Sequence, residues 1–138
     1  MRNIVGFVMA PALGLAAMLG PVLVSPPAKH YDAPLFPVVR DAVEGVGVPQ
    51  LILLFAAGVA LGVVSTSRAW LLGLAAIAAL PIVTVLELIK DPASHNLFPL
   101  EFATYAFYGI VVMCGVLAIR RVRRPQLLSK NSPQGVPE

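Results

Sequence analysis

The fold is decided by residues 48–90, which read VPQLILLFAAGVALGVVSTSRAWLLGLAAIAALPIVTVLELIK. Two long apolar runs, at about 48–64 and 69–89, are separated by the short turn Ser65–Arg68. A helix needs roughly 20 apolar residues to cross the hydrocarbon core of a bilayer, with a range of about 17–25. Lipid offers the backbone no hydrogen-bond partner, and these runs lack the short alternating pattern of barrel strands. They are therefore predicted to be two membrane-spanning helices.

Two further apolar runs flank this pair, at about 4–24 and 97–119. The first is longer than the apolar core of a usual signal peptide, so we expect it to be retained as a helix. The 138 residues are 58% hydrophobic and only 12% charged, whereas soluble domains have about 25% charged residues. We therefore predict an all-α integral membrane domain over residues 1–124, a four-transmembrane-helix bundle, followed by a disordered cytoplasmic tail at 125–138. Three prolines inside these runs are expected to kink their helices: Pro11, Pro21 and Pro81.

The distribution of Lys and Arg predicts the orientation of the bundle, because cytoplasmic loops carry the excess of positive charge. Seven basic residues lie on one predicted side: Arg2, Arg68, Arg120, Arg121, Arg123, Arg124 and Lys130. Three lie on the other side: Lys29, Arg40 and Lys90. The sequence thus predicts a multi-pass protein of the cell (inner) membrane with its N-terminus and C-terminus in the cytoplasm. The four clustered arginines, Arg120, Arg121, Arg123 and Arg124, are suited to anchor this topology and to hold anionic lipid.

The predicted outer loop between the first two spans contains a short amphipathic helix. It starts at Pro37, a residue that suits a first helical turn. One face carries Val38, Val39, Ala42, Val43 and Val46, and the other carries Arg40, Asp41 and Glu44. We expect this helix to lie on the outer membrane surface or to cap the bundle.

Small residues spaced four apart predict where the helices pack closely, because they let two backbones approach in lipid. Three such pairs occur: Gly58 with Gly62, Ala10 with Gly14, and Ala16 with Gly20. They indicate either packing of the first two spans against each other or a homodimer seam.

One polar cluster is predicted at the outer ends of the last two spans. Glu87 and Asp91 end one span, Glu101 begins the next, and His95 lies in the loop between them. Tyr105 and Tyr108 share a helical face with Glu101. Carboxylates with an imidazole can bind an ion or pass protons. The alternative is structural, because Glu101 can cap its helix and Glu87 can hydrogen-bond across the helix pair.

The chain has no nucleotide-binding, zinc-protease, dithiol or serine-hydrolase motif, and its single cysteine, Cys114, is expected to be an apolar filler. The sequence thus favours a non-enzymatic role, without cofactor, committed metal or nucleic acid. We expect an accessory or self-associating interaction protein of the lipid bilayer, as a homo-oligomer or with a larger membrane-protein partner. The alternative is a homo-oligomeric cation- or proton-coupled transporter or channel using Glu87 and Glu101. A metal-dependent membrane enzyme using His95 is the third hypothesis.

Overall fold

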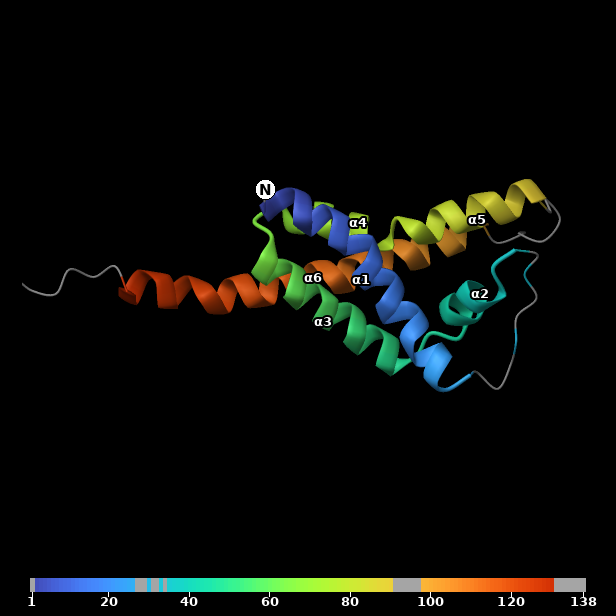
Figure 1. The fold of residues 1–138 in the computed structure, drawn as a ribbon, viewed down its shortest axis with the longest axis horizontal. Helices are drawn as coiled ribbons and strands as arrows, with labels where there is room; N and C mark the ends of the chain where they lie inside the picture. Colours follow the sequence, from blue (N-terminus) through green and yellow to red (C-terminus); the bar gives the residue numbers. More distant parts are fainter. Residues whose placement is uncertain (1, 27–29, 31–32, 34, 91–97, 131–138) are drawn as a thin grey trace, which may run out of the picture.

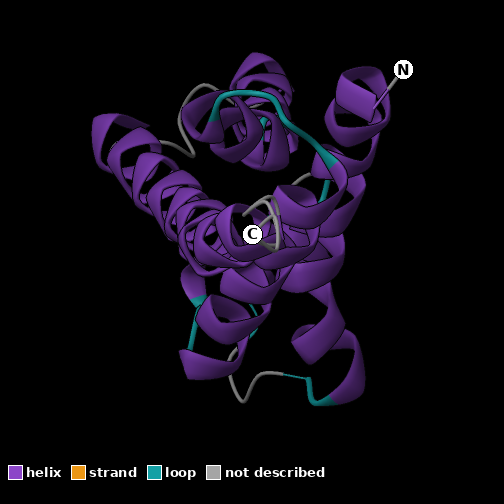
Figure 2. Ribbon diagram, turned by 90° about the vertical axis from the view of Figure 1, so that its left-hand side faces the viewer, coloured by secondary structure: helices purple, strands orange, loops and turns teal. Residues whose placement is uncertain are grey.

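The computed structural model describes residues 2–26, 30, 33, 35–90 and 98–130. All regular structure in these ranges is α-helical, as predicted (Figure 1 and Figure 2). The helices are α1 (Arg2–Val24), α2 (Pro37–Glu44), α3 (Val48–Val64), α4 (Ala69–Ile77), α5 (Ala79–Lys90) and α6 (Phe98–Lys130).

Three stretches are long and apolar enough to cross a membrane, namely Asn3–Val24, Ala69–Lys90 and Pro99–Arg123. The 17-residue helix α3 joins α2 at an angle of 97°, and this bent pair passes the same test when it is counted as one span. Large apolar side chains cover much of the surface, among them Ile4, Val8, Ile52, Ile89 and Leu100, each more than 60% exposed. A water-soluble protein rarely exposes large contiguous apolar patches. The apolar helices therefore indicate a membrane protein.

The predicted span at 69–89 is formed by two consecutive helices, α4 and α5, with Ala78 between them. Pro81 explains the break, because it has no N–H to donate to the Ile77 carbonyl and its ring crowds that oxygen. The Ala78 N–H instead bonds the Ala75 carbonyl at 3.3 Å, one residue closer than in an α-helix. The helical hydrogen bonding is thus interrupted at Ala78, three residues before Pro81. Pro11 and Pro21, by contrast, lie inside the single helix α1.

The last helix is longer than the predicted span at 97–119, since α6 continues to Lys130. In Figure 1 its C-terminal part extends past the other helices. Residues 125–130, which the sequence placed in a disordered tail, belong to this helix, and 131–138 lie outside the described residues.

Glycine contacts show the relative directions of the helices. A Cβ on Gly58 would overlap the Val112 carbonyl, and one on Gly62 would meet Val116, so α3 and α6 run in the same direction. Gly6 lies near Leu72 and Gly14 lies against Ala76, so α1 and α4 also run in one direction.

Helices α4 and α6 run in opposite directions. Gly73 faces Gly109 and Met113, whereas Ile77, one turn further along α4, also faces Gly109. The helices α1, α3, α4 and α6 therefore alternate in direction along the chain, as in an up-and-down bundle. Fully buried apolar side chains lie between them, including Leu54, Leu61, Leu72, Val112 and Val116.

Candidate functional site

Helix α2 lies between the end of α1 and the α5–α6 pair (Figure 1). The chain enters α2 through Pro37, whose fixed φ suits the first turn of a helix. It leaves at Gly45, whose N–H bonds the Asp41 carbonyl at 2.9 Å. Ala42 and Val43 are buried, as expected for the apolar face, but Val38 is 42% exposed.

The predicted polar face of α2 is turned toward the protein. Asp41 is buried, and the side chains of Arg40 and Glu44 are only 19% and 31% exposed. Arg40 forms an ion pair with Glu44, one helical turn away on α2. The same guanidinium also donates from Nη1 to Glu101 Oε1 on α6, at 2.9 Å. A pair with both side chains mostly buried holds α2 to α6 more strongly than an exposed pair would.

Glu87 connects α5 to the start of α2. Glu87 is only 2% exposed, and its Oε1 accepts a hydrogen bond from the Phe36 N–H at 3.3 Å. Phe36 precedes α2, where the first backbone N–H groups of a helix have no partner inside the helix. A carboxylate at this place satisfies one such group and complements the helix dipole.

The two predicted tyrosines lie on the buried side of this arrangement. The Tyr105 hydroxyl and Thr84 Oγ1 share a hydrogen bond of 2.6 Å between α6 and α5. Tyr108 donates from its hydroxyl to the Val43 carbonyl of α2 at 3.2 Å. Glu87 lies one helical turn from Thr84 on α5, and Glu101 lies one turn from Tyr105 on α6, so these side chains form one polar cluster.

A further polar contact joins His30 to Asp41 of α2. Nδ1 of His30 and Oδ2 of Asp41 are 3.0 Å apart. The histidine side chain is 75% exposed and the aspartate side chain only 7%, so His30 covers a carboxylate that faces inward. This contact holds His30 against α2.

The structure therefore brings together four of the six predicted cluster residues, Glu87, Glu101, Tyr105 and Tyr108. Asp91 and His95, the other two, lie outside the described residues. Within the described part of the chain, no group of three or more His, Cys, Asp or Glu side chains is arranged to hold a metal ion. The arrangement that is present joins three helices through charge pairs and hydrogen bonds.

Sequence reasoning missed the role of Arg40. It placed this residue among the outer-loop charges and on the polar face of the predicted short helix, but it did not identify the partner Glu101, which is 61 residues away in the chain. Asp41 was predicted on the same polar face, but its contact with His30 was not, because the sequence does not determine how this loop folds over the bundle. One signal could have indicated this contact. Arg40 was predicted on a short helix at the same end of the bundle as the two carboxylates Glu87 and Glu101.

The predicted packing residues divide into two groups. Gly58, Gly62 and Gly14 are in close backbone contact within the chain, and Ala10 is fully buried. Gly58 and Gly62 pack against α6 rather than against the first span, so this face is already covered. Ala16 is exposed, and a Cβ on Gly20 would meet nothing within 4 Å.

At the opposite end of the bundle, Arg120 donates to the Ser65 carbonyl at 2.7 Å. This bond fixes the α3–α4 turn to α6. Arg121 and Arg123 are exposed, and the side chain of Arg124 lies outside the described part.

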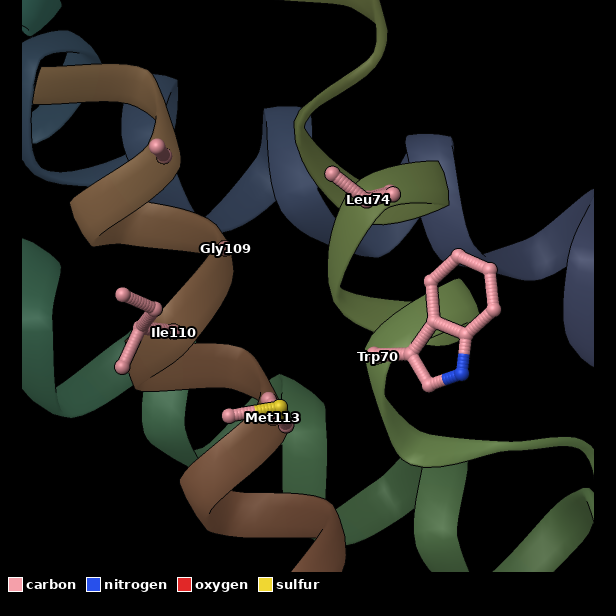
Figure 3. Close-up of a pocket in the computed structure, with 6 residues that line it drawn as sticks. Trp70, Leu74, Gly109, Ile110 and Met113 are labelled. Carbon is pink, nitrogen blue, oxygen red and sulfur yellow. The ribbon is translucent and has the colours of Figure 1, made fainter. Parts of the chain in front are cut away.

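An apolar groove of about 230 Å³ lies on the bundle surface between α4 and α6 (Figure 3). Its lining residues are Trp70, Leu74, Ala106, Gly109, Ile110 and Met113. Trp70 stands on the α4 side of the groove, and Gly109 contributes no side chain on the α6 side.

No protein-family model, curated protein or solved structure matches this chain. Its function has to be argued from the chemistry of its own residues.

Proposed function

We propose that the chain is a four-span protein of the cell (inner) membrane that acts as an accessory or self-associating interaction protein. The observation that supports this role is that the residues of the polar cluster hold helices together. Arg40, Glu87, Glu101 and Tyr108 are engaged in holding α2 against α5 and α6. A group that stabilises the fold in this way is less available to bind a transported ion.

The alternating helix directions support four spans. Helix α3, with 17 residues, reaches the lower end of the range of about 17–25 that crosses a bilayer. It runs parallel to α6 and is preceded by the sharp bend to α2. In this proposal α2 lies across the outer end of the bundle, and α3 alone makes the second span.

The charges at the two ends support the proposed orientation. The bond from Arg120 to Ser65 brings the turn that carries Arg68 to the end of α6 that carries Arg121 and Arg123. Lys90, at the end of α5, is at the other end of the bundle. By the positive-inside rule, the arginine-rich end faces the cytoplasm.

The alternative function is a homo-oligomeric cation- or proton-coupled transporter. The observation in its favour is the burial of Glu87, because an ionisable side chain inside a membrane helix is costly and often functional. The hydrogen bond from Phe36 to this carboxylate and the Arg40–Glu101 pair give both acids a structural role, which favours the interaction protein.

The first test is native mass spectrometry of the protein extracted gently from its own membrane. A stoichiometric complex with another membrane protein would support the accessory role. A homo-oligomer is expected both of a self-associating protein and of the transporter alternative, and the flux measurement below separates these two. A monomer without partners under these conditions would contradict it.

The transporter alternative is tested by ion flux in vesicles reconstituted with the purified protein. Glu87→Gln and Glu101→Gln should each abolish flux if these acids carry the ion. A flux that survives both substitutions, or no flux in the unsubstituted protein, excludes that reading.

A further inference from the structure

We infer that α2 is a hinged cover over the outer end of the bundle, closed by the ion pair between Arg40 and Glu101. When this pair separates, α2 moves away from α5 and α6 and exposes the polar surface around Thr84 and Tyr105 to water. This device goes beyond the proposed function, because it concerns a motion of the single chain whatever the chain associates with.

The first argument is the size of α2. It has 8 residues, and an isolated helix shorter than about 12–15 residues is marginal in water. Helix α2 therefore keeps its place and its helical form through contacts with its neighbours. Losing a few of these contacts is enough to release it, whereas α3 and α6 are held along many turns by close backbone packing.

The second argument is the chemistry of the contacts on the α5–α6 side. The polar contacts there include Arg40 with Glu101 at 2.9 Å, Phe36 with Glu87 at 3.3 Å, and Tyr108 with the Val43 carbonyl at 3.2 Å. Hydrogen bonds exchange readily for bonds to water, so their net contribution is small when water can enter. The contacts of α2 with α1 are more extensive than its contacts with α5 or α6. The α5–α6 side is thus the side that opens.

The third argument is the connection to α3. Gly45 ends α2 and Gly47 precedes α3, and the chain turns by 97° between the two helices. Residues without a side chain can absorb changes in backbone angles at low cost. The two glycines on either side of Val46 therefore provide a hinge at one end of the cover.

The surface under the cover is chemically different from the rest of the bundle. Thr84 and Tyr105 are buried, bonded to each other, and adjacent to the carboxylates of Glu87 and Glu101. Opening would give water access to hydroxyl and carboxylate groups within a protein whose exposed surface is mainly apolar.

A buried thiol under α2 tests the inference directly. Thr84 is buried, and Thr84→Cys places a thiol on the surface that opening of α2 would expose. Cys114, which is exposed, is first replaced by serine so that the reporter is the only thiol. The purified protein in detergent is treated with a water-soluble maleimide, and the labelling rate reports how often α2 opens.

We expect Arg40→Gln and Glu101→Gln each to raise the labelling rate at least about tenfold, the factor that corresponds to about 1.4 kcal/mol. Combining the two substitutions should give no further increase, because both remove the same contact. The matched control is Glu44→Gln, which removes only the pair within α2. Such a pair contributes a few tenths of a kcal/mol, so the rate should change by less than about twofold.

Equal labelling of all variants, or an effect of Glu44→Gln as large as that of Glu101→Gln, would overturn the inference. Hydrogen exchange of the unsubstituted protein is a second test that requires no variant. The α2 amides should exchange well before those of α3 while the bundle stays folded. Equal protection of α2 and α3 would show that α2 is a fixed part of the bundle.

Discussion

Arg40 shows at the scale of the residue how one side chain can position a whole element. Its guanidinium has several donors in a planar arrangement and can contact two carboxylates at once. In this chain the two are Glu44 on its own helix and Glu101 on α6. Sequence patterns placed Glu101 correctly at the start of the last span, but they could not identify its partner, because contact between distant residues depends on how the loop folds.

Substitutions at two glycines, Gly58 and Gly20, should have opposite effects on stability. Gly58→Ala should destabilise the bundle by about 1–3 kcal/mol, because the added methyl group overlaps the Val112 carbonyl and forces α3 away from α6. Gly20→Ala should be neutral or stabilising by up to about 1 kcal/mol, since nothing lies near its Cβ and alanine favours a helix. Unfolding in mixed detergent micelles measures both. A loss of stability with Gly20→Ala as large as with Gly58→Ala would contradict this account of the packing.

The buried hydroxyl pair makes a second prediction. Thr84→Val and Tyr105→Phe each leave one hydroxyl without its observed partner, so each should cost about 1–3 kcal/mol. The double variant should cost less than the sum, because the two groups are lost together. A double-mutant cycle on the free energy of unfolding measures this coupling. Strict additivity would show that the 2.6 Å contact contributes nothing to stability.

At the scale of the element, the lengths of the apolar runs predicted most of the helix bounds. The expected helix at 48–64 agrees with α3, and the run at 69–89 corresponds to α4 and α5 together. The expected end at 119 falls short of the observed end of α6 at Lys130, because hydropathy marks where a span leaves the lipid and not where the backbone stops being helical. A basic segment can continue a helix into water.

Replacing Pro81 should change how α4 and α5 are joined. Pro81→Ala should let the residue 81 N–H bond the Ile77 carbonyl and join α4 to α5 in one straight helix. Straightening would move Glu87 relative to Phe36 and loosen α2. Hydrogen exchange should show a protected amide at residue 81 and faster exchange in α2. The control Ile82→Ala, which truncates an exposed side chain next to the break, should leave α2 unchanged.

The whole molecule is organised as two parallel helix pairs, α1 with α4 and α3 with α6. Composition and run length predicted an all-helical membrane chain, but the choice of pairs could not be predicted. From sequence alone, the helix face with Gly58 and Gly62 could pack on the first span or on a second copy of the chain. Its observed contact with Val112 and Val116 depends on the shape of both backbones.

Thiol labelling tests the proposed orientation. In a Cys114→Ser background, Ser25→Cys should react with a membrane-impermeant reagent on intact cells, because residue 25 follows α1 at the outer end. Thr66→Cys, in the turn held by Arg120, should react only after the membrane is permeabilised. Both positions are exposed, so the two variants control for each other. The reverse pattern would place the arginine-rich end outside the cytoplasm.

The close contact between α3 and α6 also has a consequence for the order of events during synthesis. Helix α3 leaves the ribosome well before α6, so its glycine face has to wait in the bilayer until the later helix is made. During this interval the face is open to helices of other nascent chains. Biogenesis of the protein would therefore be most vulnerable to misassembly between the emergence of Gly58 and that of Val112, a period in which an insertase or a membrane chaperone would protect the unfinished chain.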